Sequence, residues 1–167
     1  MTESGLHYKF PGSESLERRT MPQALRTLAR RLERFAGLSA YSINYVLANL
    51  YTTQLSSLSQ HHDKTRDLLP DTPIITVSLG EKRIMQFDLD VPGARILVGI
   101  RGAQALTAAK EIYGDRVKSF MFGMRPRSAL ILDQESNAVY RHGIPPSSEG
   151  KSPRVSLTFR CVRKTTT

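Results

Sequence analysis

The chain contains almost no cysteine and no long apolar run. Its single cysteine, Cys161, cannot form an internal disulfide, and we expect it to be a packing residue rather than a nucleophile. No Cys-x-x-Cys or Cys/His cluster suggests zinc. Eighteen consecutive apolar residues occur nowhere, and no charged segment followed by an apolar run opens the sequence. We therefore expect an intracellular, cytoplasmic protein with no membrane association.

Acidic residues are also scarce relative to basic ones. The 167 residues include 24 Lys+Arg and 15 Asp+Glu, which gives a net charge of +9 and a pI near 10.1. This balance favours polyanionic partners through phosphate contacts, although charge alone leaves a merely solvated basic surface equally open. The basic residues concentrate at Arg18, Arg19, Arg26, Arg30, Arg31, Arg34, Arg160, Arg163 and Lys164.

One helical pattern is strong. Between residues 22 and 37 apolar side chains recur at helical spacing, arginines occupy the opposite face, and Gly37 provides a plausible end. The apolar positions are Leu25, Leu28, Leu32 and Phe35. We expect an amphipathic helix that packs on a sheet and has a solvated arginine face. Residues 1–20, rich in glycine and serine, are predicted to be an arm or a partial substrate lid ahead of one domain at 21–167.

The remainder is typical of short strands separated by turns. Strands are predicted at 42–52, just before His61, and at 74–79, 83–89, 94–100, 117–122, 128–133, 137–142 and 155–162. Residues 80–82 would join two of these strands as a hairpin, 64–72 would form a loop, and 103–113 could be a short surface helix. Many short strands and one good helix predict a mainly β (α+β) sandwich rather than a doubly wound fold.

A metal site is suggested by His61-His62-Asp63 together with a distant His142. In an extended strand residues i and i+2 point the same way, so His61 and Asp63 can reach one metal while His62 points elsewhere. A third ligand must come from another strand, and His142 is available. Two imidazoles and one carboxylate suit an Fe(II) that leaves positions open for a keto acid and oxygen. Each motif alone is more often a surface turn, and the ordered combination favours the metal site.

The last predicted strand carries two arginines at even spacing. Arg154 and Arg160 share one face, with Ser156 and Thr158 between them. A buried carboxylate is costly unless a planar, bidentate donor neutralises it, and arginine suits that task. Arginines that bracket a terminal strand are usually solvated. Arg154 and Arg160 therefore indicate a carboxylate site only in combination with the histidines and the aspartate.

These motifs together resemble the AlkB family of Fe(II)/2-oxoglutarate dioxygenases, from about Tyr8 to Arg160. The shared elements are Asn49-Leu50-Tyr51, Ser78-Leu79-Gly80 with the following Arg83, His142-Gly143, and the ending from Arg154 to Arg160. The ending is the most specific of them. The resemblance implies a double-stranded β-helix, or jelly roll, that holds iron at one mouth.

The resemblance also implies a role for each matching residue. It assigns His61, Asp63 and His142 to Fe(II), and Arg154 to the distal carboxylate of 2-oxoglutarate. It suggests that Tyr51 hydrogen-bonds this carboxylate and that Asn49 and Arg160 steady the end nearer the metal. Taken alone, Asn49 is more often a cap or turn residue and Tyr51 a core aromatic. Ser156 stands where some relatives carry asparagine, and its role is left open.

The implied reaction is oxidative demethylation of alkylated RNA or DNA, with release of formaldehyde, succinate and CO2. Many nucleobase demethylases carry an acid soon after the metal triplet, whereas this sequence has Thr65 and Arg66, so a cationic base loses its partner unless Asp67 shifts inward. Little precedes Tyr8, so we expect either a domain of a larger polyprotein, as in plant-virus replicases, or a minimal enzyme. Residues 94–118 also match the family pattern poorly.

Three hypotheses of function follow. The leading one is nucleobase demethylation with Fe(II), 2-oxoglutarate and O2, by a protein that we expect to be monomeric. The second is oxidation of a protein side chain or small metabolite at the same centre, favoured by the missing acid. The third is a nucleic-acid-binding module with an inactive centre, disfavoured because all three ligands and both arginines are present.

Overall fold

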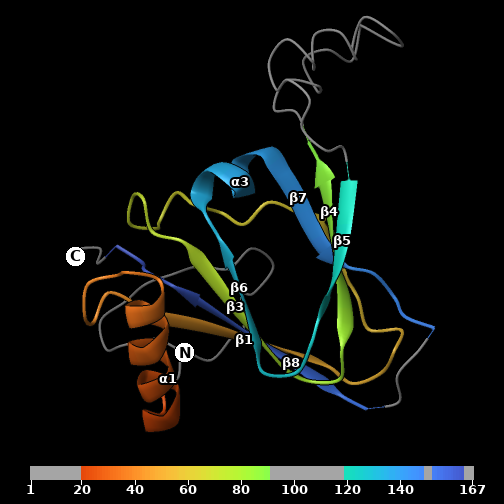
Figure 1. Ribbon diagram of the computed structural model, residues 1–167, viewed down its shortest axis with the longest axis horizontal. Coiled ribbons are helices and arrows are strands. Elements are labelled where there is room, and N and C mark those ends of the chain that lie inside the picture. Colours follow the sequence, from red (N-terminus) through yellow and green to blue (C-terminus); the bar gives the residue numbers. More distant parts are fainter. Residues whose placement is uncertain (1–19, 91–118, 149–151, 164–167) are drawn as a thin grey trace, which may run out of the picture.

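Two antiparallel four-stranded sheets face each other in a computed structural model, which describes residues 20–90, 119–148 and 152–163 (Figure 1). Sheet A has the order β1 (Tyr45–Tyr51), β8 (Arg154–Arg160), β3 (Ile74–Gly80) and β6 (Ser128–Leu132). Sheet B has the order β2 (Leu58–His61), β7 (Tyr140–Ile144), β4 (Arg83–Leu89) and β5 (Ser119–Met124). The predicted mainly β jelly roll is therefore confirmed.

The predicted amphipathic helix forms as α1 (Gln23–Phe35), on the side of sheet A away from sheet B (Figure 1). Its buried residues Ala29 and Leu32 belong to a core cluster that includes Ile75 and Phe159 of sheet A. Gly37 follows the helix with φ of +67°, a conformation that glycine adopts without strain. Leu25, Leu28 and Leu32 thus pack where they were expected, whereas the prediction is wrong for Phe35, which is 77% exposed at the end of the helix.

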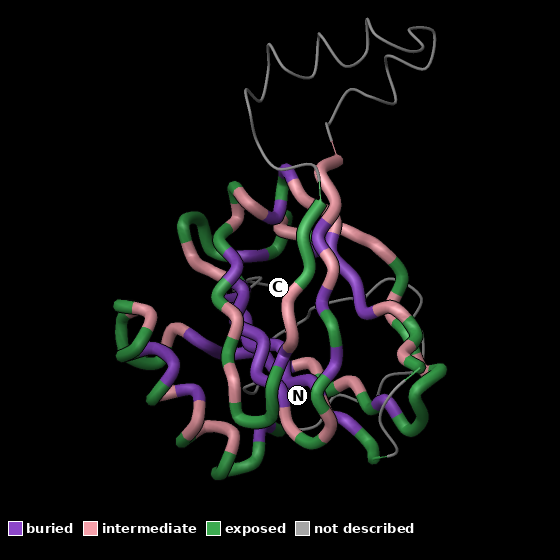
Figure 2. The backbone as a smooth tube through the Cα atoms, turned by 45° about the vertical axis from the view of Figure 1, so that its right-hand side comes forward, coloured by how far each residue is buried: buried purple, intermediate pink, exposed green. Residues whose placement is uncertain are grey.

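A second core lies between the sheets, and the most buried segments run through the centre of the fold (Figure 2). It joins Tyr45 and Ile74 of sheet A to Met85, Phe87 and Ile144 of sheet B. Because side chains alternate along a strand, β8 sends Leu157 and Phe159 to the α1 side and its even-numbered polar residues between the sheets. The interior therefore contains a polar strip beside an apolar core.

The predicted hairpin across residues 80–82 is wrong. β3 pairs with β6 and β8 in sheet A, whereas β4 pairs with β5 and β7 in sheet B, so the connection crosses from one sheet to the other. Gly80 has φ of +80°, and a Cβ there would lie 2.3 Å from the Pro153 carbonyl oxygen. Glu81 still donates its N–H to that oxygen, which holds the crossing against the start of β8. The turn residues predict a change of direction but not the strand's partner.

The strand predicted at 137–142 is partly wrong. Helix α3 (Gln134–Val139) occupies its first half, and β7 begins only at Tyr140. Asp133 caps this helix, since its carboxylate accepts the Ser136 N–H at 2.6 Å. An Asp-x-x-Ser cap therefore overrides the β-branched and aromatic residues that suggested a strand.

The loop before β3 forms as predicted, whereas three other predicted segments fall outside the described residues. Residues 64–72 form the expected loop, with a single bridge from Leu68 to Val162. The strand predicted at 94–100, the helix at 103–113 and the first nineteen residues of the arm lie outside the described residues. Neither α1 nor α3 has the length and apolar character of a membrane-spanning helix.

Candidate metal centre

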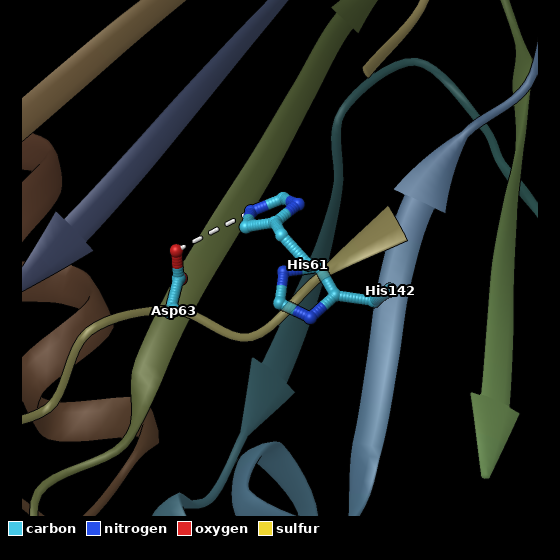
Figure 3. Close-up of side chains that lie close together, drawn as sticks. All are labelled: His61, Asp63 and His142. Carbon is cyan, nitrogen blue, oxygen red and sulfur yellow. Dashed lines mark ion pairs between the residues drawn. The ribbon is translucent and has the colours of Figure 1, made fainter. Parts of the chain in front are cut away.

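Three predicted ligands meet between the sheets (Figure 3). His61 ends β2 and lies opposite His142 of β7 in the strand register, while Asp63 follows in the loop. One ligand atom from each residue lies within 4.8 Å of the others. The strand pairing therefore supplies the two imidazoles, and the chain beyond β2 brings the carboxylate to them.

The hydrogen bonds of His61 orient its ring for metal binding. Its Nδ1 lies 2.8 Å from the Ser59 carbonyl oxygen, which can only accept, so Nδ1 carries the hydrogen of this bond. Its Nε2 lies 3.6 Å from Oδ1 of Asp63. In the neutral ring Nε2 is then the atom with a free lone pair, and it faces the other ligands.

The charges around the centre favour cation binding. Burial alone would raise the pKa of Asp63, but His61 and the Arg160 guanidinium, 2.7 Å from its carboxylate, hold this pKa well below its usual range. Burial lowers the pKa of His142 to about 4, so this imidazole is neutral near pH 7. The hydrogen bond to Asp63 raises the pKa of His61, which makes His61 the ligand whose proton competes with a cation.

Residues predicted to bind 2-oxoglutarate line the inner face of sheet A in rows. Tyr51 pairs with Arg154, and Asn49 pairs with Ser156, which in turn pairs with Ser78 of β3. Directly opposite residues of antiparallel strands share a face, so all five side chains belong to one patch. The structure therefore brings together the positions that the resemblance had linked across the sequence.

Arg154 is the most telling member of this patch. It is 1% exposed, and its Nε donates to the Ser78 hydroxyl at 2.9 Å. Among the described residues its two terminal nitrogens have no hydrogen-bond partner. Burial lowers the pKa of this guanidinium. A buried fork of donors without an acceptor fits a carboxylate, which would bind it through two parallel hydrogen bonds.

Tyr51 lies beside Arg154 and Arg83. The Tyr51 ring centroid lies 4.9 Å from the Arg154 guanidinium carbon and 5.7 Å from that of Arg83. Burial raises the pKa of Tyr51, while the Arg154 charge opposes this rise, so the hydroxyl remains protonated. Arg83 donates to the carbonyls of Ser56 and Pro145 at 2.7 Å, which joins two loops to β4.

No pattern in the sequence indicates the part played by Asn137 of α3. Its side-chain amide accepts the Asp63 N–H and donates to the Asp63 carbonyl, both at 2.9 Å, and it is 2% exposed. Asp63 lies beyond the end of β2, so Asn137 supplies the pairing that a neighbouring strand would otherwise give. Asn137 therefore fixes the backbone of a predicted ligand. No spacing rule connects two residues 74 positions apart.

His62 lies outside the group of ligands, as predicted, and its ring is hydrogen-bonded to Asn137 and Asp90. Its Nδ1 bonds the Asn137 carbonyl, and its Nε2 lies 3.1 Å from Oδ2 of Asp90. Asp90 also pairs with Arg141, which precedes His142 in β7. These contacts connect the ligand loop to the ligand strand through side chains.

The acid that could have met a cationic base does not move inward. Asp67 is exposed, and its carbonyl accepts the Arg163 N–H at 2.8 Å. Arg66 is exposed as well, and Thr65 is half-buried. The loop therefore presents no carboxylate to the centre after Asp63.

Comparison with known proteins decides the family. The sequence profile of the 2OG-Fe(II) oxygenase superfamily matches residues 1–160. The chain belongs to this superfamily, within the AlkB family. The superfamily's name states its chemistry, oxygenation with Fe(II) and 2-oxoglutarate. The arrangement of His61, Asp63 and His142 fits iron.

Individual relatives are distant. DNA oxidative demethylase ALKBH2 of Homo sapiens is 25% identical over 96% of this chain and 54% of its own length. Alpha-ketoglutarate-dependent dioxygenase alkB homolog 3 of Homo sapiens is 28% identical over 83% of this chain and 42% of its own. The structure of OsALKBH1 superposes with a TM-score of 0.53 at 18% identity, over 84% of this chain and 66% of that one. The chain thus spans about half the length of these curated relatives.

Proposed function

We propose that this dioxygenase oxidatively demethylates alkylated nucleobases in DNA or RNA, releasing formaldehyde, succinate and CO2. The observation that carries the proposal is the meeting of His61, Asp63 and His142, together with a buried Arg154 whose two terminal nitrogens have no hydrogen-bond partner among the described residues. The first group suits a metal that keeps positions open, and the second suits a dicarboxylate co-substrate. The names of the relatives, DNA oxidative demethylases among them, support the substrate class.

In this proposal, residues of both sheets hold the cofactors. His61, Asp63 and His142 bind Fe(II), and Arg154 binds the distal carboxylate of 2-oxoglutarate with help from Tyr51. The nearer end of the co-substrate is steadied by Asn49, Ser156 and Arg160. When bound, iron and 2-oxoglutarate supply, with O2, the oxidation of an N-methyl carbon to a hydroxymethyl group, which then leaves as formaldehyde.

The chain's own contribution is to fix protonation states and exclude water. Arg160 keeps Asp63 ionised, and burial keeps His142 neutral, so these two ligands need no proton loss near pH 7. Phe87 stacks on the His142 ring at 5.7 Å between centroids and shields that side of the centre. No side chain is required as a general base.

The net charge of +9 supports a nucleic-acid substrate. The exposed position of Asp67 favours a second candidate, oxidation of a protein side chain or small metabolite, because a cationic base would find no carboxylate in this loop. The two candidates share the iron centre and differ only in what reaches it.

The test is formaldehyde and succinate release from DNA and RNA oligonucleotides that carry methylated adenine or cytosine. We expect release that requires Fe(II) and 2-oxoglutarate and falls at least a hundredfold in His61→Ala. The matched control is His62→Asn, which removes a neighbouring imidazole outside the ligand group and should cost less than tenfold. Turnover of methylated peptides or free metabolites alone would replace the first candidate by the second. Equal activity in His61→Ala and wild type would reject the metal site.

A further inference from the structure

A basic hollow lies on the outer side of α1, separate from the metal centre. Helix α1 and the loop that leads to β1 enclose about 450 Å³, lined in part by Arg30, Arg31, Arg34 and Tyr41. Sheet A stands between this hollow and the ligands, because α1 packs on the face of the sheet opposite to the metal centre. Whatever occupies the hollow therefore does not touch the iron.

Among the described residues that line the hollow, the one acid is buried and hydrogen-bonded within the protein. Glu33 is 1% exposed and accepts the N–H groups of Tyr41 and Ile43 at 3.1 and 2.8 Å. Arg30 also donates to it at 2.8 Å. Burying a carboxylate is costly unless donors satisfy it, and here three partners do so. The charge presented to solvent is then that of Arg31 and Arg34, which are exposed.

The tyrosine whose backbone N–H bonds Glu33 has an unusual conformation. Tyr41 has φ of +64°, a left-handed conformation that a bulky residue rarely adopts, and the residue is 75% exposed. The Arg30 guanidinium carbon lies 4.1 Å from the ring centroid. The guanidinium covers one side of the ring, and the high exposure leaves much of the remainder open to a ligand.

Cations beside an open aromatic ring match the chemistry of a nucleic-acid strand. Arginines neutralise backbone phosphates, and bases stack on aromatic side chains with little regard to sequence. An acidic peptide or an anionic membrane would satisfy the arginines but would not require the ring. We propose that this basic hollow binds single-stranded nucleic acid, with phosphates on Arg31 and Arg34 and a base on Tyr41.

This surface adds an anchoring contact to the proposed function. A strand long enough to pass around sheet A could occupy the hollow while a methylated base elsewhere on it enters the metal centre. Anchoring should then lower the KM for long substrates and leave very short ones unaffected. The binding itself does not depend on demethylation, so the two ideas can fail separately.

The first test is the fluorescence anisotropy of labelled, unmethylated 20-nucleotide single strands of DNA and RNA with the full chain. We expect Arg31→Gln/Arg34→Gln to weaken binding about tenfold and to reduce the slope of log K against log salt by about 1.4, the value for two phosphate contacts. The control, Lys82→Gln/Arg125→Gln, removes the same charge from exposed positions outside the hollow and should change both quantities much less. An equal loss in the control would overturn the site.

Tyr41 distinguishes nucleic acid from other polyanions. Tyr41→Ala should weaken strand binding about fivefold with the salt slope unchanged, whereas Tyr41→Phe should retain the affinity because it keeps the ring. Polyglutamate and anionic vesicles should bind Tyr41→Ala as well as they bind wild type. If Tyr41→Ala binds strands normally, the surface is a general anion site and the inference fails. Thermal melting of each variant verifies the fold.

A second measurement separates this inference from the proposed function. With methylated trinucleotides and methylated 20-mers as substrates, Arg31→Gln/Arg34→Gln should raise the KM only for the 20-mers. Demethylation with normal strand binding in this variant would reject the hollow and leave the function standing. Strand binding without any demethylation would reject the proposed function and leave the binding site in the hollow standing.

Discussion

The two halves of the candidate site are built differently. The half assigned to 2-oxoglutarate lies on β1, β8 and β3, where continuous strand pairing aligns Tyr51 with Arg154 and Ser78 with Ser156. The half assigned to iron has only two paired positions between β2 and β7, and Asp63 lies beyond them. There the backbone is held by a side chain, the amide of Asn137.

This difference predicts how each half responds to damage. In the first half a substitution removes a side chain from a sheet whose backbone bonds remain intact, so binding should change more than folding. In the second half the loss of one side chain leaves backbone groups unsatisfied, so folding and metal binding should fall together. Variants that separate binding from stability therefore test the comparison directly.

The largest effect is expected from Arg154→Met. Removing the buried guanidinium should raise the KM for 2-oxoglutarate about a hundredfold, since a bidentate, charge-assisted pair contributes about 2 to 3 kcal/mol. The protein without co-substrate should nevertheless melt at a higher temperature, because a buried charge with two unpaired nitrogens is replaced by an apolar chain. Steady-state kinetics and calorimetry measure the two responses.

Exposed Arg125→Met is the control for Arg154→Met and should alter neither quantity. A parallel loss of stability and co-substrate binding in Arg154→Met would contradict the proposed division. It would mean that Arg154 stabilises the sheet and is not a binding site for the co-substrate carboxylate.

A smaller effect, of the opposite kind, is expected from Asn137→Ala. The Asp63 N–H and carbonyl lose their partners, so the free energy of unfolding should fall by about 2 kcal/mol. Binding of Co(II), followed by its absorption spectrum, should weaken about tenfold, the scale found when groups that orient metal ligands are removed. The KM for 2-oxoglutarate should change little once metal is saturating.

Ala138→Ser, at an exposed position on the same helix, controls for general disturbance of α3. If Asn137→Ala lost stability but kept full Co(II) affinity and an unchanged spectrum, Asn137 would be structural only. The ligand loop would then be fixed by the neighbours of His62 instead.

The regular half of the site was the more predictable from sequence. Even spacing placed Arg154, Ser156 and Arg160 on one face, and a strand's period of two leaves little freedom for that result. The pair His61 and Asp63 was also predicted to share a metal, although Asp63 lies past the end of β2. Strand spacing therefore predicts that His61 and Asp63 lie close together. It does not predict that the Asn137 side chain holds the Asp63 backbone in place.

The other half depends on contacts that no local pattern encodes. Asn137 meets Asp63 only because α3 precedes β7, at a place where the sequence pattern predicts a strand. The hairpin error at 80–82 has the same origin. Turn chemistry determines where the chain reverses, whereas the choice of sheet depends on which faces remain to be covered.

The smallest effect is expected at Asp133. This residue caps α3, the helix whose Asn137 holds the Asp63 backbone. Its carboxylate caps α3, and Asp133→Ala should lower the free energy of unfolding by about 1 kcal/mol. The backbone hydrogen bond from Ser136 lowers the pKa of Asp133 in the folded protein. The cap's charged contribution is therefore present above the usual aspartate range and is lost as pH falls through the lower, folded pKa. The difference in melting temperature between wild type and Asp133→Ala should narrow in acid. Asp133→Asn caps without ionising, so its difference in melting temperature from Asp133→Ala should not change with pH. A gap that does not depend on pH would show that the cap works without its charge.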